Sequence, residues 1–157
     1  MKFGQDFEKI FFKLSLAKPK YLEKIHKGFY TSEEIDTMHF LATKFHEKFH
    51  ETPKAEQMKV LVQSPKFKGK VEDSIIELVY NTDLTQYDEE WLISTAEAWI
   101  KWRTFDTTLI DTIEYIKTTE VTPENADSII SKVKTLINDR NSIVFNSDLG
   151  LDFFNAD

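Results

Sequence analysis

Residues 88–120, DEEWLISTAEAWIKWRTFDTTLIDTIEYIKTTE, form the longest uninterrupted apolar pattern in the chain. Apolar residues recur there at intervals of three and four, which predicts a helix of about eight turns that follows a cap at Asp88. Thr122-Pro123 then supplies a second cap with proline at the first helical position. We expect a helix there that returns along the first as a hairpin. Its apolar face consists of Ala126, Ile129, Ile130, Val133, Leu136 and Ile137.

The rest of the chain has the same helical character. Only four glycines and four prolines occur in 157 residues, which is little turn punctuation for a β fold. The sequence therefore predicts an all-α fold: a small helical bundle over residues 1–85, a long C-terminal helical hairpin over 86–144, and the start of a linker at 145–157. The bundle helices are expected at residues 5–15, 18–28, 32–51, 53–62 and 71–80.

The third of these helices has the clearest signals. Ser32 is a suitable N-cap, and Thr52-Pro53 ends the helix near Glu51. Apolar residues repeat along one face with the spacing of a helix that packs on a core. We expect all five to be buried: Ile35, Met38, Ala42, Phe45 and Phe49.

Composition sets the class of protein. The length fits one domain, and without cysteine there is no disulfide framework or thiolate metal site, so a reducing, cytoplasmic setting is expected. The 20 basic against 27 acidic residues give a net charge of −7, which attracts nucleic acid poorly at long range. The N-terminus, MKFGQDFEKIFFKLSL, has neither a signal-peptide apolar stretch nor a membrane span, so we expect a soluble protein without membrane contact.

His46-Glu47-Lys48-Phe49-His50 matches the H-E-x-x-H pattern of zinc metalloproteases. A third protein ligand is missing from the usual downstream position, and the helix ends directly after His50. Histidines beside the packed face of an amphipathic helix are the preferred interpretation, with a small zinc protease as the least favoured alternative. No other catalytic residues, metal site or cofactor motif is found; Gly69-Lys70 is followed by Val71, which does not make a phosphate-binding P-loop.

Residues 65–70, PKFKGK, form the one basic loop. Lys66, Lys68 and Lys70 alternate with Phe67 and Gly69, a combination that suits contact with a nucleic-acid backbone and stacking of a base on the ring. Solvated lysines without a partner are the favoured interpretation in so acidic a chain. Both interpretations stay open at the level of the sequence.

The long helix carries more aromatic surface than one buried face can hide. Trp91, Trp102 and Phe105 lie off that face. The face expected to be buried is marked by Leu92, Ala96, Trp99 and Ile113. Either other helices of the same domain cover the three aromatic side chains or a second copy does, in a two-fold symmetric interface.

Two stretches resemble a known family. WLISTAEAWIKWRTF (91–105) looks like the start of the helical hairpin in the N-terminal domain of phage replicative DNA helicases of the DnaB type, especially the T-even-type branch. VFNSDLGLDFFNAD (144–157) resembles the segment that leads to the linker before the helicase motor, although Leu151 stands where the family commonly has histidine. The order of the small helices before them follows the family less specifically.

The resemblance implies a non-catalytic collar domain whose hairpins pair two-fold, which builds a hexamer in the full-length ATP-dependent helicase and presents a docking site for primase. DNA contact would belong mainly to a motor domain beyond Asp157, and no cofactor is implied here. A stand-alone helical adaptor that modulates a replisome is the alternative. Hairpin closure and dimer contact are expected to involve Trp91, Leu92, Trp99, Trp102, Phe105, Ile129, Val133 and Leu136. The linker would include Phe145, Gly150, Asp152, Phe153 and Phe154.

Overall fold

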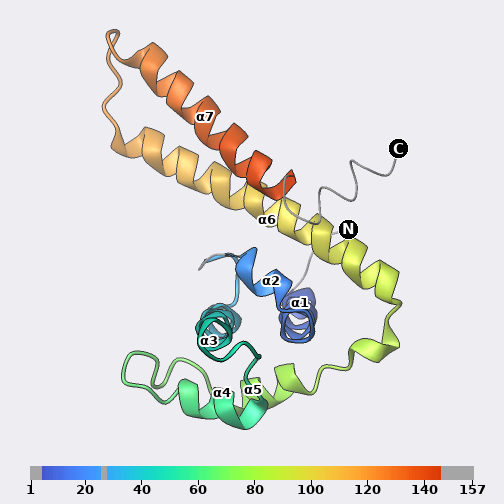
Figure 1. The fold of residues 1–157 in the computed structure, drawn as a ribbon. Coiled ribbons are helices and arrows are strands. Elements are labelled where there is room, and N and C mark those ends of the chain that lie inside the picture. The colour runs from blue at the N-terminus through green and yellow to red at the C-terminus, as the bar shows by residue number, and fades with distance from the viewer. Residues whose placement is uncertain (1–4, 26–27, 146–157) are drawn as a thin grey trace. The chain divides into compact units, whose positions relative to one another are not determined.

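A computed structural model describes residues 5–25 and 28–145 of the chain, and every regular element within these ranges is helical (Figure 1). The predicted all-α class is confirmed. The chain divides into two compact units, residues 1–89 and 90–157. The elements are α1 (Gln5–Ala17), α2 (Lys20–Glu23), α3 (Glu33–Phe49), α4 (Ala55–Leu61), α5 (Asp73–Tyr80), the 3-10 turn η1 (Leu84–Gln86), α6 (Glu89–Thr118) and α7 (Ala126–Phe145).

The first unit is a bundle built on α1 and α3, which lie side by side with α2 against both of them and with α4 and α5 on the opposite side (Figure 1). Phe11 and Phe12 of α1 are fully buried, as is Met38 of α3. The ring of Phe11 meets that of Tyr21 edge-on, with centroids 5.7 Å apart. Burial of large side chains from each helix gives this unit a continuous apolar core.

Helix α3 begins as predicted. The Ser32 side chain accepts a hydrogen bond from the Ile35 backbone N–H at 3.3 Å, which satisfies one of the free amides of the first turn. The other end corrects the prediction. Ile35 is buried, but Phe45 is only half-buried and Phe49 is 51% exposed.

The last turn of α3 is exposed on every side, because Lys48, Phe49 and His50 are all exposed and His50 ends the helix in a left-handed conformation with φ 59°. Periodicity places Phe49 on the same face as Ile35, Met38 and Ala42, but its exposure shows that the core does not extend to the last turn of the helix. The ring of Phe49 packs on Phe45, with centroids 4.7 Å apart, and the Lys48 ammonium lies 5.3 Å from its centre. The prediction that Phe49 belongs to the core is therefore wrong.

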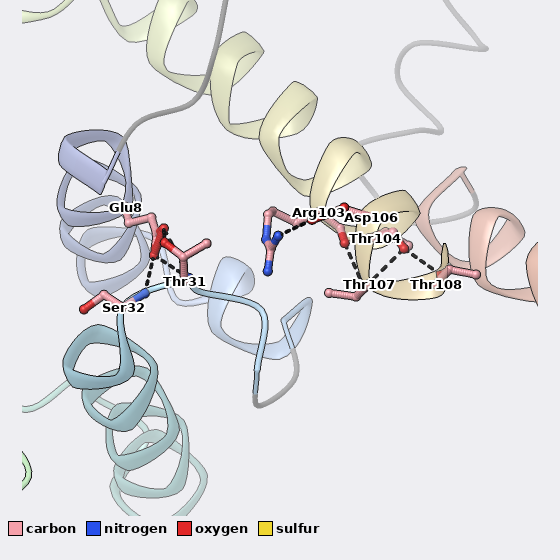
Figure 2. Close-up of polar contacts among 8 residues, drawn as sticks. All are labelled: Glu8, Thr31, Ser32, Arg103, Thr104, Asp106, Thr107 and Thr108. Atoms are coloured by element: carbon pink, nitrogen blue, oxygen red, sulfur yellow. Dashed lines mark hydrogen bonds and ion pairs between the residues drawn. The ribbon is translucent and has the colours of Figure 1, made fainter. Parts of the chain in front are cut away.

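A buried carboxylate ties α1 to the start of α3 (Figure 2). Glu8 is 3% exposed, and its Oε1 accepts hydrogen bonds from the backbone N–H groups of Thr31 at 2.8 Å and Ser32 at 3.1 Å. Its Oε2 accepts one from the Thr31 hydroxyl at 2.5 Å. The turn between α2 and α3 is therefore fixed by a side chain from α1, since these donors have a charged acceptor inside the protein.

A second buried polar group is His39 on α3. The Tyr30 hydroxyl donates to its Nδ1 at 2.8 Å, and its Nε2–H donates to the Leu22 carbonyl at 3.2 Å. Burial lowers the pKa of His39 to about 4, against a smaller opposite effect of the bond to Leu22, so the imidazole is neutral at pH 7. Burial also raises the pKa of Tyr30 well above its usual value, which keeps that hydroxyl a donor.

The second unit consists of the long helix α6 and the helix α7. The side chain of Arg140 forms an ion pair with Asp111 at 2.6 Å, and the Lys132 ammonium lies 4.9 Å from the centre of the Tyr115 ring. Asp111 precedes Tyr115 on α6, whereas its partner Arg140 follows Lys132, the partner of Tyr115, on α7. The two helices therefore run antiparallel. Close apolar packing of the pair as a hairpin remains a prediction.

The turn before α7 has the expected capping chemistry. The Thr122 N–H donates to the Asn125 side-chain oxygen at 2.7 Å, while the Asn125 N–H donates to the Thr122 hydroxyl at 3.3 Å. This reciprocal pair holds the turn in the manner of a capping box. Regular helix then begins at Ala126 rather than at Pro123.

Candidate protein interaction surface

The segment from Lys101 to Arg140 lacks buried apolar side chains. Within it only Thr108 and Thr112 are buried. The Thr108 hydroxyl donates to the Thr104 carbonyl one turn earlier at 2.6 Å (Figure 2), which satisfies it within α6. The buried Thr112 hydroxyl has no hydrogen-bond partner. The part of α6 that follows Ile100, and α7 as far as Arg140, thus lack the apolar burial that usually stabilises helices in proteins.

The apolar side chains of this part of α6 lie outside. Five of them, spaced by three, four, four and three residues, follow one face of the helix. We name this set the α6 apolar stripe: Trp102 (52% exposed), Phe105 (41%), Leu109 (38%), Ile113 (51%) and Ile116 (45%). The first two rings are in contact, with centroids 6.2 Å apart. These side chains form one continuous exposed apolar face rather than scattered surface residues.

The residues predicted for the interface fall into three groups. Trp91 is 42% exposed, and with Trp102 and Phe105 it lies outside the buried face as predicted. Leu92 and Trp99 are 5% and 1% exposed, so they are already covered in the single chain. The α7 residues are half-buried: Ile129, Val133 and Leu136.

Ile113 corrects the sequence interpretation. It was grouped with the buried face, yet it is 51% exposed and belongs to the α6 apolar stripe. A helix has 3.6 residues per turn, so a face marked by Leu92 and Trp99 drifts around the axis over the following four turns. Of the predicted linker residues, Phe145 is the last residue of α7. The others lie outside the described residues: Gly150, Asp152, Phe153 and Phe154.

Two ion pairs of α6 are made within the second unit, one beside the stripe and one on the opposite face of the helix. Arg103 pairs with Asp106 one turn later at 2.6 Å (Figure 2), and Asp111 pairs with Arg140. Asp111 lies about 200° around the helix from Leu109 and Ile113, so only the Arg103–Asp106 pair borders the stripe. An apolar centre with charged groups at its edge is usual for protein interfaces.

The H-E-x-x-H motif does not form a zinc site in the part of the chain that is described. His46 is half-buried on α3, while exposed His50 caps the helix outside regular geometry. Glu47 pairs with Lys44 at 3.5 Å. Over residues 5–25 and 28–145 no three His, Asp or Glu side chains converge to hold a metal ion. A zinc protease needs such a set of three ligands.

The structure also corrects the interpretation of the basic loop, residues 65–70. Phe67 is 7% exposed, and its ring packs on Phe40 of α3 with centroids 6.0 Å apart. A ring that is buried in this way is not available to stack on a base. The lysines of the loop, Lys66, Lys68 and Lys70, are exposed. The stacking part of the nucleic-acid interpretation is therefore wrong.

Comparison with known proteins identifies no relative: no family model matches the chain, and neither a curated protein sequence nor a solved structure matches it. Of the helices in the described ranges, none has both the length and the apolar character needed to cross a membrane.

Proposed function

We propose that this chain is a non-catalytic assembly domain that pairs with a second copy through the α6 apolar stripe. More specifically, we propose that it serves as the N-terminal collar domain of a DnaB-type replicative DNA helicase of the T-even-type branch, in line with the resemblance of residues 91–105 and 144–157. The observation that carries the proposal is the exposure of Trp102, Phe105 and the three aliphatic residues that continue their face.

A second copy suits this surface on physical grounds. Burying the exposed half of each stripe side chain would contribute roughly 1 kcal/mol. The stripe is repeated by symmetry in an identical partner, and an isologous contact brings every member against the same kind of surface. The spacing of three and four residues is also the spacing by which paired helices interdigitate. Pairing would supply the apolar burial that the segment from Lys101 to Arg140 does not have alone.

In this proposal the chain acts mechanically. Paired domains would build a collar on a hexameric ring and present a docking site for primase in the cytoplasm, while ATP hydrolysis and movement along DNA would belong to a separate motor domain. The domain itself would need no cofactor, and its negative net charge of −7 suits contact with protein better than with DNA.

The helicase assignment is tested by reading the encoding DNA beyond the codon for Asp157. An open frame that continues into a motor segment with a P-loop would support it. A stop codon at that point would refute it. The alternative of a stand-alone helical adaptor, which pairs with a collar domain of a replisome, would then be preferred, because the α6 apolar stripe suits pairing in either case.

A further inference from the structure

Three lysine ammonium groups gather over two aromatic rings of the first unit. The Lys44 ammonium lies 5.7 Å from the centre of the Phe40 ring, and that of Lys70 lies 5.9 Å from the centre of the Phe67 ring. The Lys66 ammonium lies within reach of both rings, at 5.8 and 5.5 Å. We name these five residues the basic platform. Contact with the ring faces positions each charge, since the face of an aromatic ring attracts cations.

The loop that carries Lys66 and Lys70 is fixed to the bundle. Phe67 and Val71 are buried, at 7% and 4% exposure. The Phe67 N–H donates to the Ser64 carbonyl at 2.9 Å, and the Lys70 N–H donates to the Phe67 carbonyl at 3.0 Å. Lys66 and Lys70, each next to one of these buried residues, are therefore presented by a defined turn, which lowers the entropy lost when they bind a partner.

The charges of the platform are poorly neutralised. Among the described residues no carboxylate forms an ion pair with Lys66 or Lys70, and Lys44 has only an exposed pair with Glu47 at 3.5 Å. Like charges that converge raise the energy of the free protein, and an anionic partner removes that repulsion.

An open groove of about 690 Å³ extends from the platform along α3. Phe40, Phe67 and Lys70 line it at the end near the platform, while Glu33 and Asp36 line it further along. The groove thus joins a basic end to an apolar wall and then to an acidic end. A ligand that fits all three must be negative over a short length only.

We propose that the basic platform binds a short acidic segment of a partner protein, with its carboxylates on Lys66 and Lys70 and a neighbouring apolar side chain against Phe40 in the groove. This inference does not depend on the proposed function. A nucleic acid suits the site less well, because its continuous negative backbone would run toward Glu33 and Asp36, and because buried Phe67 offers no face to a base.

The test uses the whole chain and the fluorescein-labelled peptide Glu-Asp-Glu-Phe-Phe-Ser, whose acids lie at one end only, with binding followed by fluorescence anisotropy. The paired variant Lys66→Glu/Lys70→Glu should bind about tenfold more weakly, since two exposed ion pairs are replaced by repulsion. Lys117→Glu/Lys134→Glu, which makes the same charge change at exposed positions of α6 and α7, is the matched control and should bind within about twofold of the unchanged protein. Circular dichroism checks that both variants are folded.

Two altered probes separate the parts of the proposal. The peptide with Gln and Asn in place of its acids should lose binding, and the peptide with serine in place of both phenylalanines should bind more weakly than the parent. Absence of saturable binding, or equal loss in both charge variants, would overturn the proposal. It would also be overturned if single-stranded oligothymidine bound more tightly than the peptide and lost binding on Lys66→Glu/Lys70→Glu, because the platform would then be a nucleic-acid site.

Discussion

In the first unit Phe11, Phe12 and Met38 are fully buried, whereas in the second unit Trp102 and Ile113 are about half exposed. Among the described residues, nine of the twelve exposed large apolar side chains lie from Trp91 onward. The residue types are similar, so the arrangement of the helices makes the difference. Several short helices enclose a core in the first unit, while two long antiparallel helices leave one apolar face of α6 outside. The first unit therefore encloses its large apolar side chains, whereas the second leaves exposed the face of α6 through which we propose that it pairs.

The largest expected effect on stability comes from comparing the substitution of one aromatic residue in each unit by alanine. Phe11→Ala should lower the free energy of unfolding by about 3–5 kcal/mol, because it removes a fully buried ring and leaves a cavity. Trp102→Ala should change the stability of the monomer by roughly 0.5 kcal/mol or less, since its side chain is already half exposed. Urea unfolding of dilute protein measures both. Similar losses for the two variants would contradict the distinction between the units.

The buried histidine of the first unit predicts a dependence on pH. Because the pKa of His39 is about 4 when folded and 6.5 when unfolded, unfolding takes up a proton between these values. The free energy of unfolding should therefore fall as the pH falls from 6.5 to 4, by up to about 3 kcal/mol from this group. The free energy of unfolding, measured by urea unfolding at several pH values in this range, should depend less steeply on pH for His39→Gln than for the unchanged protein. An equally steep dependence on pH in both proteins would show that the imidazole is not buried in its neutral form.

The carboxylate that joins α1 to α3 gives the next effect. Glu8→Gln should cost about 2 kcal/mol, because the turn at Thr31 and Ser32 loses a charged acceptor in a buried place. Glu56→Gln is the matched control, since the side chain of Glu56 is 87% exposed; its ion pair with Lys59 should contribute less than about 1 kcal/mol. Thermal unfolding of both variants compares them. A loss no greater for Glu8 than for Glu56 would rule out a structural role for the buried carboxylate.

The smallest effect sharpens the account of α3. Ser32→Ala should destabilise the first unit by about 1 kcal/mol, because the Ile35 amide loses its acceptor at the start of the helix. Amide hydrogen exchange in this variant should be faster than in the unchanged protein at the first turn of α3, and the increase there should be larger than at Met38. Unchanged exchange at that turn would show that the cap is dispensable.

Much of the fold follows from local signals in the sequence. Periodicity predicted the helices, Ser32 and Thr122 marked their starts, and the positions of Trp91, Trp102 and Phe105 predicted the aromatic surface of α6. These features depend on neighbours three or four residues apart. Phe49 was misplaced because periodicity gives the face of a helix but not how far the core extends along it, and Ile113 was misplaced because the buried face drifts around the axis of a long helix.

The polar interior was missed for a different reason. Glu8 contacts a turn more than twenty residues later, and His39 contacts Leu22 and Tyr30 from separate elements. No pattern in a single sequence reports such pairs, since they exist only after the helices have packed. The basic platform likewise depends on the approach of Phe67 to Phe40, which turned an apparently exposed aromatic residue into an anchor.

Self-association through the α6 apolar stripe is measured most directly by sedimentation equilibrium over a range of protein concentrations. The unchanged chain should shift from monomer to dimer, and Trp102→Glu should remain a monomer, because a charge would then be buried at the centre of the apolar contact. Val60→Glu, at a position 72% exposed in the first unit, should dimerise normally. A chain that is monomeric at every concentration, or a dimer unaffected by Trp102→Glu, would contradict the account.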